Sequence, residues 1–397
     1  MRYTIPDYYF KFKCTADQCE DTCCAGWQIG IDEASEQRYR KEKGLFRRTL
    51  RKNINFHDSV FRQQPDGSCA FLREDGLCEM VLQMGEEALC RTCHYYPRHI
   101  EEFENEREIT LSVSCPEVAK ILMSRREPVH FLHKEDEKEE TYPDYDPIFF
   151  DQLQEAREVM IQILQNRSLP ASVRAVLILG LAHDMQLRFD GGSFFTCQQL
   201  YSRYQSRKAA SYASEWLKSK ENKARQTAYQ EGHPHTTHQE GYLRHPEKDS
   251  AVAIFSYLYN LEHLRADWET VLRETESLLF KEASENDRDS YRRISKEFGA
   301  YIMTEYPDWE IQKEQLLVYF ISTYFCGAVY DGHIYSKVRM AVLCVWYIEE
   351  LLKARWLRNE KFLDTEEVCE IVYRFSREIE HSDQNLEAAE KIPIPFP

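Results

Sequence analysis

The chain has 397 residues, of which 43% are hydrophobic and 30% charged, and its formal net charge is −16. The length predicts two or three domains, and the acidity argues against non-specific nucleic-acid binding. Residues 1–133 carry a net charge of −3 and the remainder −13. An acidic C-terminal part favours either a cationic partner, such as a lysine-bearing protein surface, or simply a soluble surface.

The chain begins MRYTIPDYYFKFKC, which is polar and aromatic, so we expect no secretory signal. No run approaches the ~20 apolar residues of a membrane helix, so we expect no membrane partner. These features predict a soluble cytoplasmic protein. Thiols stay reduced in the cytoplasm, and clustered cysteines there are typical of metal binding or redox chemistry.

Nine of the thirteen cysteines fall within residues 14–115, in four segments: CTADQCEDTCCAGW, CAFLREDGLC, LCRTCHYYPR and SCPE. Residues 26–32 and 107–113 alternate in hydropathy and predict short strands. The segments DGS (66–68) and EDG (74–76), each with one glycine, predict turns. The candidate metal ligands are Cys14, Cys19, Cys23, Cys24, Cys69, Cys78, Cys90, Cys93 and Cys115.

The second half is helical in pattern. Asp146 and Pro147 are a candidate N-cap and first helical residue, and later predicted helices cover 194–225, 249–281, 287–305, 309–329, 334–357 and 365–381. We therefore expect a mainly α protein. A small Cys-rich N-terminal metal-binding domain with short strands (1–132) precedes a charged, acidic linker (133–147) and an all-α domain (148–397).

Thiolates bind soft or borderline metals, and zinc and iron–sulfur clusters are the usual results. Short spacings such as Cys19–Cys23 and Cys90–Cys93 let one turn supply two ligands. Nine thiols exceed the four that one site needs, so one site with spectators and two sites both fit. Cys24 points away from Cys23, and we expect it to serve a second metal atom, to lie beside the ligands without binding the metal, or simply to be buried. We expect thiols from at least three of the four segments to converge on one site.

Other residues fit the same chemistry less well. The radical-SAM spacing fails because Gly26 stands where a third cysteine is required. His94 and His99 suit either a metal ligand or a surface position. A polar loop is favoured over a metal site for His233, His235, His238 and His245. Apolar helical runs predict burial as small hydrophobic residues for Cys197, Cys326, Cys344 and Cys369.

The cysteine segments resemble those of a known family. FKCTADQCEDTCCAGWQIGID, CAFLREDGLCEMVLQMGEEALCRTCHYYPR and LSVSCPE resemble the flagellin lysine-N-methylase family. The N-terminal part is similar to a broader cysteine-cluster domain described as zinc- or iron-chelating. The resemblance is specific over roughly residues 8–120 and looser over the helical remainder.

The resemblance implies a cytoplasmic bacterial enzyme that methylates the ε-amino groups of flagellin lysines, with S-adenosylmethionine as methyl donor. It also implies an iron–sulfur (4Fe-4S) or zinc site on the matching cysteines, with Cys90 the weakest match. Because the cysteine-cluster domain also occurs in proteins of unknown activity, the cysteines support the metal more directly than the methyl transfer.

Methyl transfer to lysine requires a neutral, well-positioned amine. A carboxylate or tyrosine hydroxyl can accept its proton, and aromatic rings can stabilise a sulfonium cation. The stretch 319–339 offers such groups, with Tyr330, Asp331 and Tyr335 as catalytic candidates beside Tyr319, Tyr324 and His333. The simpler interpretation of this stretch is an aromatic core helix followed by a turn.

The alternative from another class is a non-enzymatic metal-binding protein that senses redox state or scaffolds a partner. An enzyme of the kind implied should bind S-adenosylmethionine and add methyl groups to flagellin, whereas a sensor should do neither.

Overall fold

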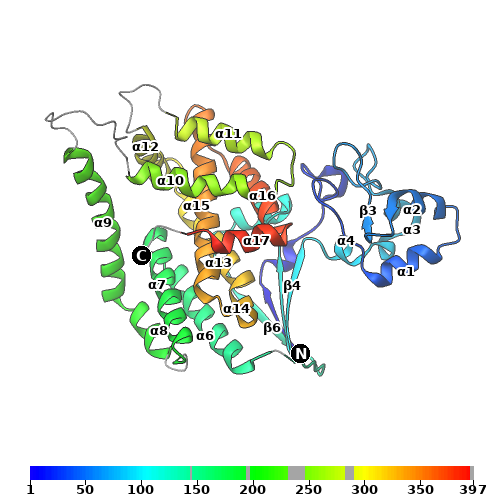
Figure 1. Ribbon diagram of the computed structural model, residues 1–397, viewed down its shortest axis with the longest axis horizontal. Helices are drawn as coiled ribbons and strands as arrows, with labels where there is room; N and C mark the ends of the chain where they lie inside the picture. Colours follow the sequence, from blue (N-terminus) through cyan, green and yellow to red (C-terminus); the bar gives the residue numbers. More distant parts are fainter. Residues whose placement is uncertain (144, 194–196, 231–245, 282–289, 394–397) are drawn as a thin grey trace.

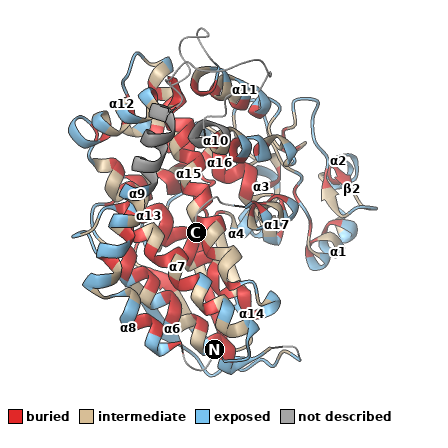
Figure 2. Cartoon of the chain, turned by 60° about the vertical axis from the view of Figure 1, so that its left-hand side comes forward, coloured by how far each residue is buried: buried red, intermediate tan, exposed pale blue. Residues whose placement is uncertain are grey.

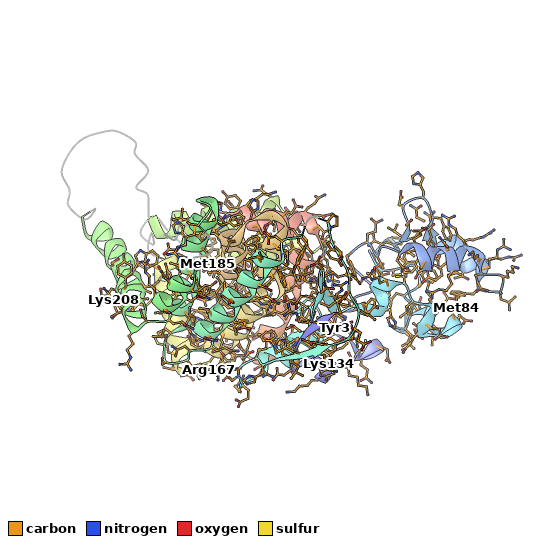
Figure 3. All side chains as sticks on the ribbon, turned by 90° about the horizontal axis from the view of Figure 1, so that it is seen from below. Tyr3, Met84, Lys134, Arg167, Met185 and Lys208 are labelled. Carbon is orange, nitrogen blue, oxygen red and sulfur yellow. The ribbon has the colours of Figure 1, made fainter. Side chains whose placement is uncertain are left out.

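The computed structural model describes residues 1–143, 145–193, 197–230, 246–281 and 290–393. The protein is mainly α, as expected: a large helical body carries a small Cys-rich unit on one side (Figure 1). Seen from below, the small unit with Met84 stands apart from the helical body, in which Arg167 and Met185 are labelled (Figure 3). None of the helices in the described ranges is long and apolar enough to span a membrane.

The small unit has its own core. Its buried residues include Tyr39, Leu50, Phe61 and Phe71, and they form a cluster separate from that of the helical body. The strand expected at 26–32 is wrong, because this part of the chain makes only isolated bridges, and Gly26 turns the backbone with a φ of +88°. The elements of this unit are α1 (Glu33–Lys41), α2 (Arg47–Asn53), β2 (Ile54–Asn55), β3 (Val60–Phe61), α3 (Glu79–Met84) and α4 (Arg91–Tyr95).

A four-stranded sheet joins the small unit to the helical body. Its strands are β1 (Arg2–Pro6), β4 (Arg98–Phe103), β5 (Glu106–Leu111) and β6 (Phe131–Glu135), in the order β4-β5-β1-β6. The pair β1–β5 is parallel and the other two pairs are antiparallel. Strand β5 confirms the strand expected at 107–113, whereas β6 occupies the first residues of the segment expected to be a linker.

The helical body follows. Asp146 caps α6 as predicted, because its carboxylate accepts hydrogen bonds from the amides of Ile148 and Phe149. The helices are α5 (Pro116–Met123), α6 (Pro147–Leu164), α7 (Ala171–Asp190), α8 (Gln198–Tyr204), α9 (Arg207–Gln230), α10 (Pro246–Ser256), α11 (Trp268–Leu279), α12 (Ser290–Thr304), α13 (Asp308–Tyr324), α14 (Ala328–Asp331), α15 (Ile334–Arg358), α16 (Thr365–Glu380) and α17 (Asp383–Lys391).

Helix α15 lies at the centre of the body. It packs against α7, α11, α13 and α16, and buried residues line it and its neighbours (Figure 2). A helix that is apolar on most of its faces belongs in the interior of a large protein. Burial was predicted for four cysteines of the body and is confirmed for Cys197, Cys326, Cys344 and Cys369.

One buried ion pair ties the sheet to the helical body. The Arg157 guanidinium on α6 donates to both carboxylate oxygens of Glu108 on β5, and both side chains are less than a tenth exposed. The same guanidinium also donates to the carbonyl of Ser322 on α13, at 3.3 Å. This pair therefore fixes β5 against two helices at once.

Arg157→Leu is expected to lower the free energy of unfolding by about 3–5 kcal/mol, because it leaves Glu108 buried without a cation. A urea titration followed by circular dichroism measures the change. The control Arg203→Leu removes an exposed pair with Asp184 and should cost less than about 1 kcal/mol. Equal losses in the two variants would contradict the importance of the buried pair.

Candidate active site

The nine N-terminal cysteines form two interacting groups. In the first group, Cys14, Cys19, Cys23 and Cys115 influence one another's ionisation. Cys115 is the N-cap residue of α5, and burial raises the pKa of its thiol to about 11. This group brings together the first and fourth cysteine segments, which lie far apart in the chain.

The second group draws on the first three cysteine segments. The thiols that influence one another here are Cys24, Cys69, Cys78, Cys90 and Cys93. The amide of Cys69 donates to the carbonyl of Cys24 at 2.7 Å, which holds two of the segments together. Burial raises the pKa of Cys69 to about 12.

The two groups meet at the adjacent pair Cys23 and Cys24. The hydrogen bond from Cys23 lowers the pKa of the Cys24 thiol to about 7. Cys23 otherwise interacts with Cys14 and Cys115, whereas Cys24 interacts with the second group. The double cysteine thus supplies one thiol to each group. All nine cysteines are free thiols. Thiols are the donors that zinc and iron–sulfur clusters take, but among the described residues no three of these sulfurs lie within 4.8 Å of one another.

A buried arginine docks the first cysteine segment onto the helical body. Arg377 on α16, which is 1% exposed, pairs with the Asp21 carboxylate at 3.0 Å. It also donates to the carbonyls of Asp21 and Ser114, at 3.2 and 3.1 Å. Arg265 pairs with the other oxygen of Asp21 at 3.0 Å. The loop that carries Cys19 and Cys23 is therefore held from two sides.

A pocket of about 330 Å³ lies beside this junction, and a glutamate stands at its wall. Three hydroxyls donate to Oε2 of Glu380: Tyr319 at 2.5 Å, Ser112 at 2.8 Å and Tyr324 at 3.1 Å. The other oxygen, Oε1, is buried and has no hydrogen-bond partner among the described residues. Burial raises the pKa of Glu380, although these hydroxyls oppose the shift.

Aromatic rings also line the pocket. The Trp27 ring lies 4.4 Å from that of His381 and 6.1 Å from that of Tyr96. The Trp27 indole donates to the carbonyl of Cys23 at 2.7 Å, so the ring is attached to the first cysteine group. Burial, together with the charge of Arg377, lowers the pKa of His381 to about 3, so its imidazole is neutral near pH 7.

An open groove of about 640 Å³ continues from this pocket, between the small unit and β4. The pocket and the groove share Trp27, Tyr96, Arg98 and His99 among their lining residues. A long molecule lying in the groove would therefore reach the neighbourhood of Glu380.

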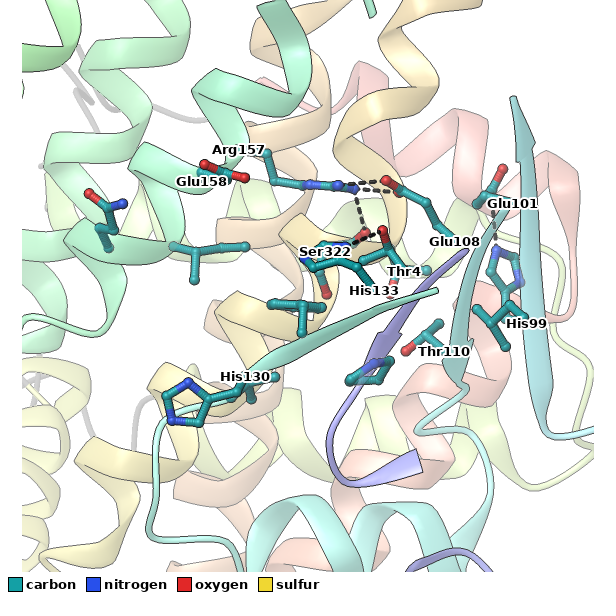
Figure 4. Close-up of a pocket in the computed structure, with 17 residues that line it drawn as sticks. Thr4, His99, Glu101, Glu108, Thr110, His130, His133, Arg157, Glu158 and Ser322 are labelled. Atoms are coloured by element: carbon teal, nitrogen blue, oxygen red, sulfur yellow. Dashed lines mark hydrogen bonds and ion pairs between the residues drawn. The ribbon is translucent and has the colours of Figure 1, made fainter. Parts of the chain in front are cut away.

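A separate cavity of about 260 Å³ lies between the sheet and helices α6 and α13 (Figure 4). The Arg157–Glu108 pair lines it, and the His99 imidazole bonds to the Glu101 carboxylate at 2.7 Å. Burial opposes protonation of His99, but Glu101 outweighs it and raises the pKa of the imidazole. His99 also lines the pocket of Glu380 and the open groove, so this one side chain borders all three spaces.

The sequence-predicted catalytic residues lie elsewhere. Tyr330 is 53% exposed and its hydroxyl donates to the carbonyl of Glu102. Asp331 pairs with Lys337, and the Tyr335 ring packs against His183. The structure does not bring these three side chains to the pocket of Glu380, although it does bring Tyr319 and Tyr324 there from the same stretch.

Among the other candidates, His99 lines the cavities and His94 is exposed next to Tyr95. The histidine-rich loop at 233–245 lies outside the described residues. Glu380 was missed by sequence reasoning. The sequence pattern that could have indicated Glu380 is its spacing: it follows Val372 and Ser376 at intervals of four residues, and both of these residues are buried on α16.

Comparison with known proteins identifies the family of this chain. The family described as "FliB lysine N-methylase C-terminal domain" matches residues 157–392, more than half of the chain. The chain belongs to the FliB lysine N-methylase family.

Two curated relatives of the family illustrate the extent of the similarity. The "Lysine-N-methylase" of Salmonella typhimurium is 32% identical over 129 residues, which are 30% of this chain and 32% of that protein. The "Flagellar biosynthetic protein FliU" of Salmonella muenchen is 32% identical over 129 residues, 30% of this chain and 76% of that protein. The match thus spans about a third of the methylase. No solved structure matches the chain.

Gly26→Ala is expected to destabilise the junction, which calorimetry would detect as a lower Tm. An added Cβ would lie 2.5 Å from the Cδ of Arg265 and push its guanidinium away from Asp21. Gly67→Ala is the control, because its φ of +81° is similar but no described atom lies within 4 Å of the new Cβ. We expect about 1–2 kcal/mol for the backbone cost in both variants and about 1–3 kcal/mol more in Gly26→Ala. Equal costs would contradict a docking role for Arg265.

Proposed function

We propose that the protein is a lysine N-methyltransferase that modifies the ε-amino groups of flagellin lysines in the cytoplasm, with S-adenosylmethionine as donor. The single observation that carries the proposal is the Glu380 carboxylate. It lines a pocket together with the aromatic rings of Trp27 and Tyr96, with Oε1 unpartnered among the described residues, in a member of a lysine N-methylase family. The names of the Salmonella relatives support lysine and the flagellum as the target.

The reaction needs a base and a dry, fixed geometry. S-adenosylmethionine would supply the methyl group as an electrophile. Glu380 would accept a hydrogen bond from the lysine amine through Oε1 and take up the proton that methylation releases. Tyr319, Tyr324 and Ser112 hold the carboxylate through Oε2, which leaves Oε1 for the substrate.

The pocket also suits a donor that carries a positive charge. The faces of Trp27 and Tyr96 can stabilise a sulfonium cation, and both rings line the pocket. The side chains of Gln28 and Asp383 line the same pocket and offer polar groups for the rest of such a molecule. His381, which is neutral near pH 7, adds no positive charge that would repel it.

We further propose that each cysteine group holds one metal centre, either an iron–sulfur cluster of the 4Fe-4S type or zinc. The first group would join the Trp27 loop to α5, and the second would bind the segments of the small unit to one another. A centre of this kind stabilises a loop-rich domain, because binding energy of the metal becomes folding energy.

Glu380→Gln is expected to lower kcat by about 10²–10⁴-fold, the usual contribution of a general base. In the parent enzyme, kcat should fall as the pH drops through the raised pKa of Glu380, and this limb should vanish in the variant. Mass spectrometry of methylated flagellin across a pH series measures both. The control Glu366→Gln lies on the same helix but is exposed, and it should behave as the parent. Unchanged activity in Glu380→Gln would contradict the proposal.

The Glu380→Gln variant should also change how the stability of the fold depends on pH. Burial raises the pKa of Glu380, so the folded parent loses stability as the pH rises from about 4.5, the ordinary value, to the raised one. The amide introduced by Glu380→Gln does not ionise, so the Tm difference between variant and parent should move in favour of the variant over this interval. A constant difference would show that the carboxyl is not perturbed.

Cys115→Ser and Cys78→Ser should each remove about half of the metal from protein purified without oxygen, because each variant disables one centre. Elemental analysis for iron, zinc and sulfide, with visible absorbance, measures the loss. Cys344→Ala, in the core of the helical body, should keep the full metal content. Loss of all metal in either variant would indicate one shared centre, and a parent free of both metals would contradict the metal proposal.

A further inference from the structure

Strand β4 is an edge of the four-stranded sheet, so one side of its backbone is not covered by another described strand. In an antiparallel pair, residues alternate between those bonded to the partner strand and those whose N–H and C=O point away. The amide of Ser112 donates to the carbonyl of Pro97 at 2.7 Å, so these two residues form a hydrogen-bonded pair. His99 lies opposite Thr110, two residues further along each strand, so the odd-numbered residues of β4 direct their N–H and C=O groups toward β5. The outward backbone groups therefore belong to the even-numbered residues.

The contact of Tyr330 agrees with this alternation. Its hydroxyl donates to the carbonyl of Glu102 at 2.7 Å, from outside the sheet. Tyr330 therefore closes the edge at Glu102. Arg98 and Ile100 remain, each with one N–H and one C=O directed away from β5.

The outward edge faces the groove beside the pocket. Arg98 and Ile100 line the groove on one side, and Asp58, Ser59 and Thr92 of the small unit line it on the other. An exposed row of backbone donors and acceptors is complementary to one kind of partner, an extended polypeptide. Asp58, whose side chain is 59% exposed, and Asp32 give the groove two carboxylates beside the guanidinium groups of Arg91 and Arg98.

We propose that the β4 edge binds an extended, lysine-bearing polypeptide segment as an added fifth strand. This inference rests on the proposed function and specifies how the substrate is recognised. The added strand would form backbone hydrogen bonds with Arg98 and Ile100, while one lysine side chain leaves it toward Glu380 through the space that the groove and the pocket share. Recognition would depend on backbone shape, so different lysines in extended segments would be accepted.

The first test uses the edge itself. Ile100→Pro removes one outward N–H but no bond to β5, and proline is tolerated on edge strands. The control Ile100→Val keeps the N–H. Fluorescence anisotropy with a labelled peptide of about ten residues that has one central lysine measures the affinity of the full-length protein. We expect at least about tenfold weaker binding for Ile100→Pro and little change for Ile100→Val. Equal affinity in the proline variant and the parent would overturn the proposal.

The second test leaves the protein unchanged, so it does not depend on folding of a variant. Two versions of the peptide carry backbone N-methyl groups on alternate residues. Counting from the lysine, one version is methylated at the odd-numbered positions and the other at the even-numbered positions. Strand addition predicts that one pattern weakens binding at least about tenfold and the other does not, because only alternate amides face the edge. Equal binding of both patterns would overturn the proposal.

The two proposals fail in different ways. A parent enzyme that methylates the plain peptide and both N-methylated forms with the same KM would contradict strand addition and leave the proposed function intact. A parent that binds the peptides with the alternating pattern but transfers no methyl group would contradict the proposed function and leave strand addition standing.

Discussion

The arrangement of the whole molecule depends on the buried pairing of Arg377 with Asp21. A buried charge is costly unless it is paired and its hydrogen bonds are satisfied. Arg377 gains its counter-charge from Asp21 on the cysteine loop and its second carbonyl acceptor from Ser114 before α5, so both segments must reach α16, even though Nε and Nη1 have no hydrogen-bond partner among the described residues. The ion pair therefore makes three distant parts of the chain adopt their positions together.

The pocket shows the result of that constraint. Trp27 belongs to the loop held by Arg377, Ser112 follows β5, and Glu380 ends α16 three residues after Arg377. Hydroxyls from the end of β5 and from α13 satisfy one oxygen of the carboxylate and leave the other without a partner in the described part of the chain. An unpartnered oxygen of this kind is a cost in stability, and such costs concentrate where a protein binds or transforms a ligand.

The helices and the cysteine groups were predictable because their signals are local. Apolar residues at helical spacing indicated α13, α15 and α16. The density of thiols between 14 and 115 predicts shared metal sites, and this stays a prediction. The sheet was harder to predict because β1 and β6 are five residues each and pair across more than a hundred residues. Glu380 was missed for the same reason, since Ser112 lies 268 residues away in the chain.

Tyr319 and Tyr324 lie within the stretch expected to form a pocket, but Tyr330, Asp331 and Tyr335 do not reach Glu380. The helical period predicts which residues share a face of one helix but not which neighbour that face meets. Tyr319 and Tyr324, five residues apart on α13, both reach Glu380 at the end of α16. The chain then turns at Gly332, which has a φ of +71°, and the following residues point to other neighbours. Sequence spacing could not show where that turn directs them.

The family match begins at residue 157, yet three components of the pocket, Trp27, Tyr96 and Ser112, precede it. A fragment restricted to the matched region would retain Glu380 without the rings of Trp27 and Tyr96 and without one of its hydroxyl donors, Ser112. The segment that matches the family description thus holds only part of the residues that line the pocket. Changes in the residues before 157 would alter the pocket while leaving the matched helices as they are.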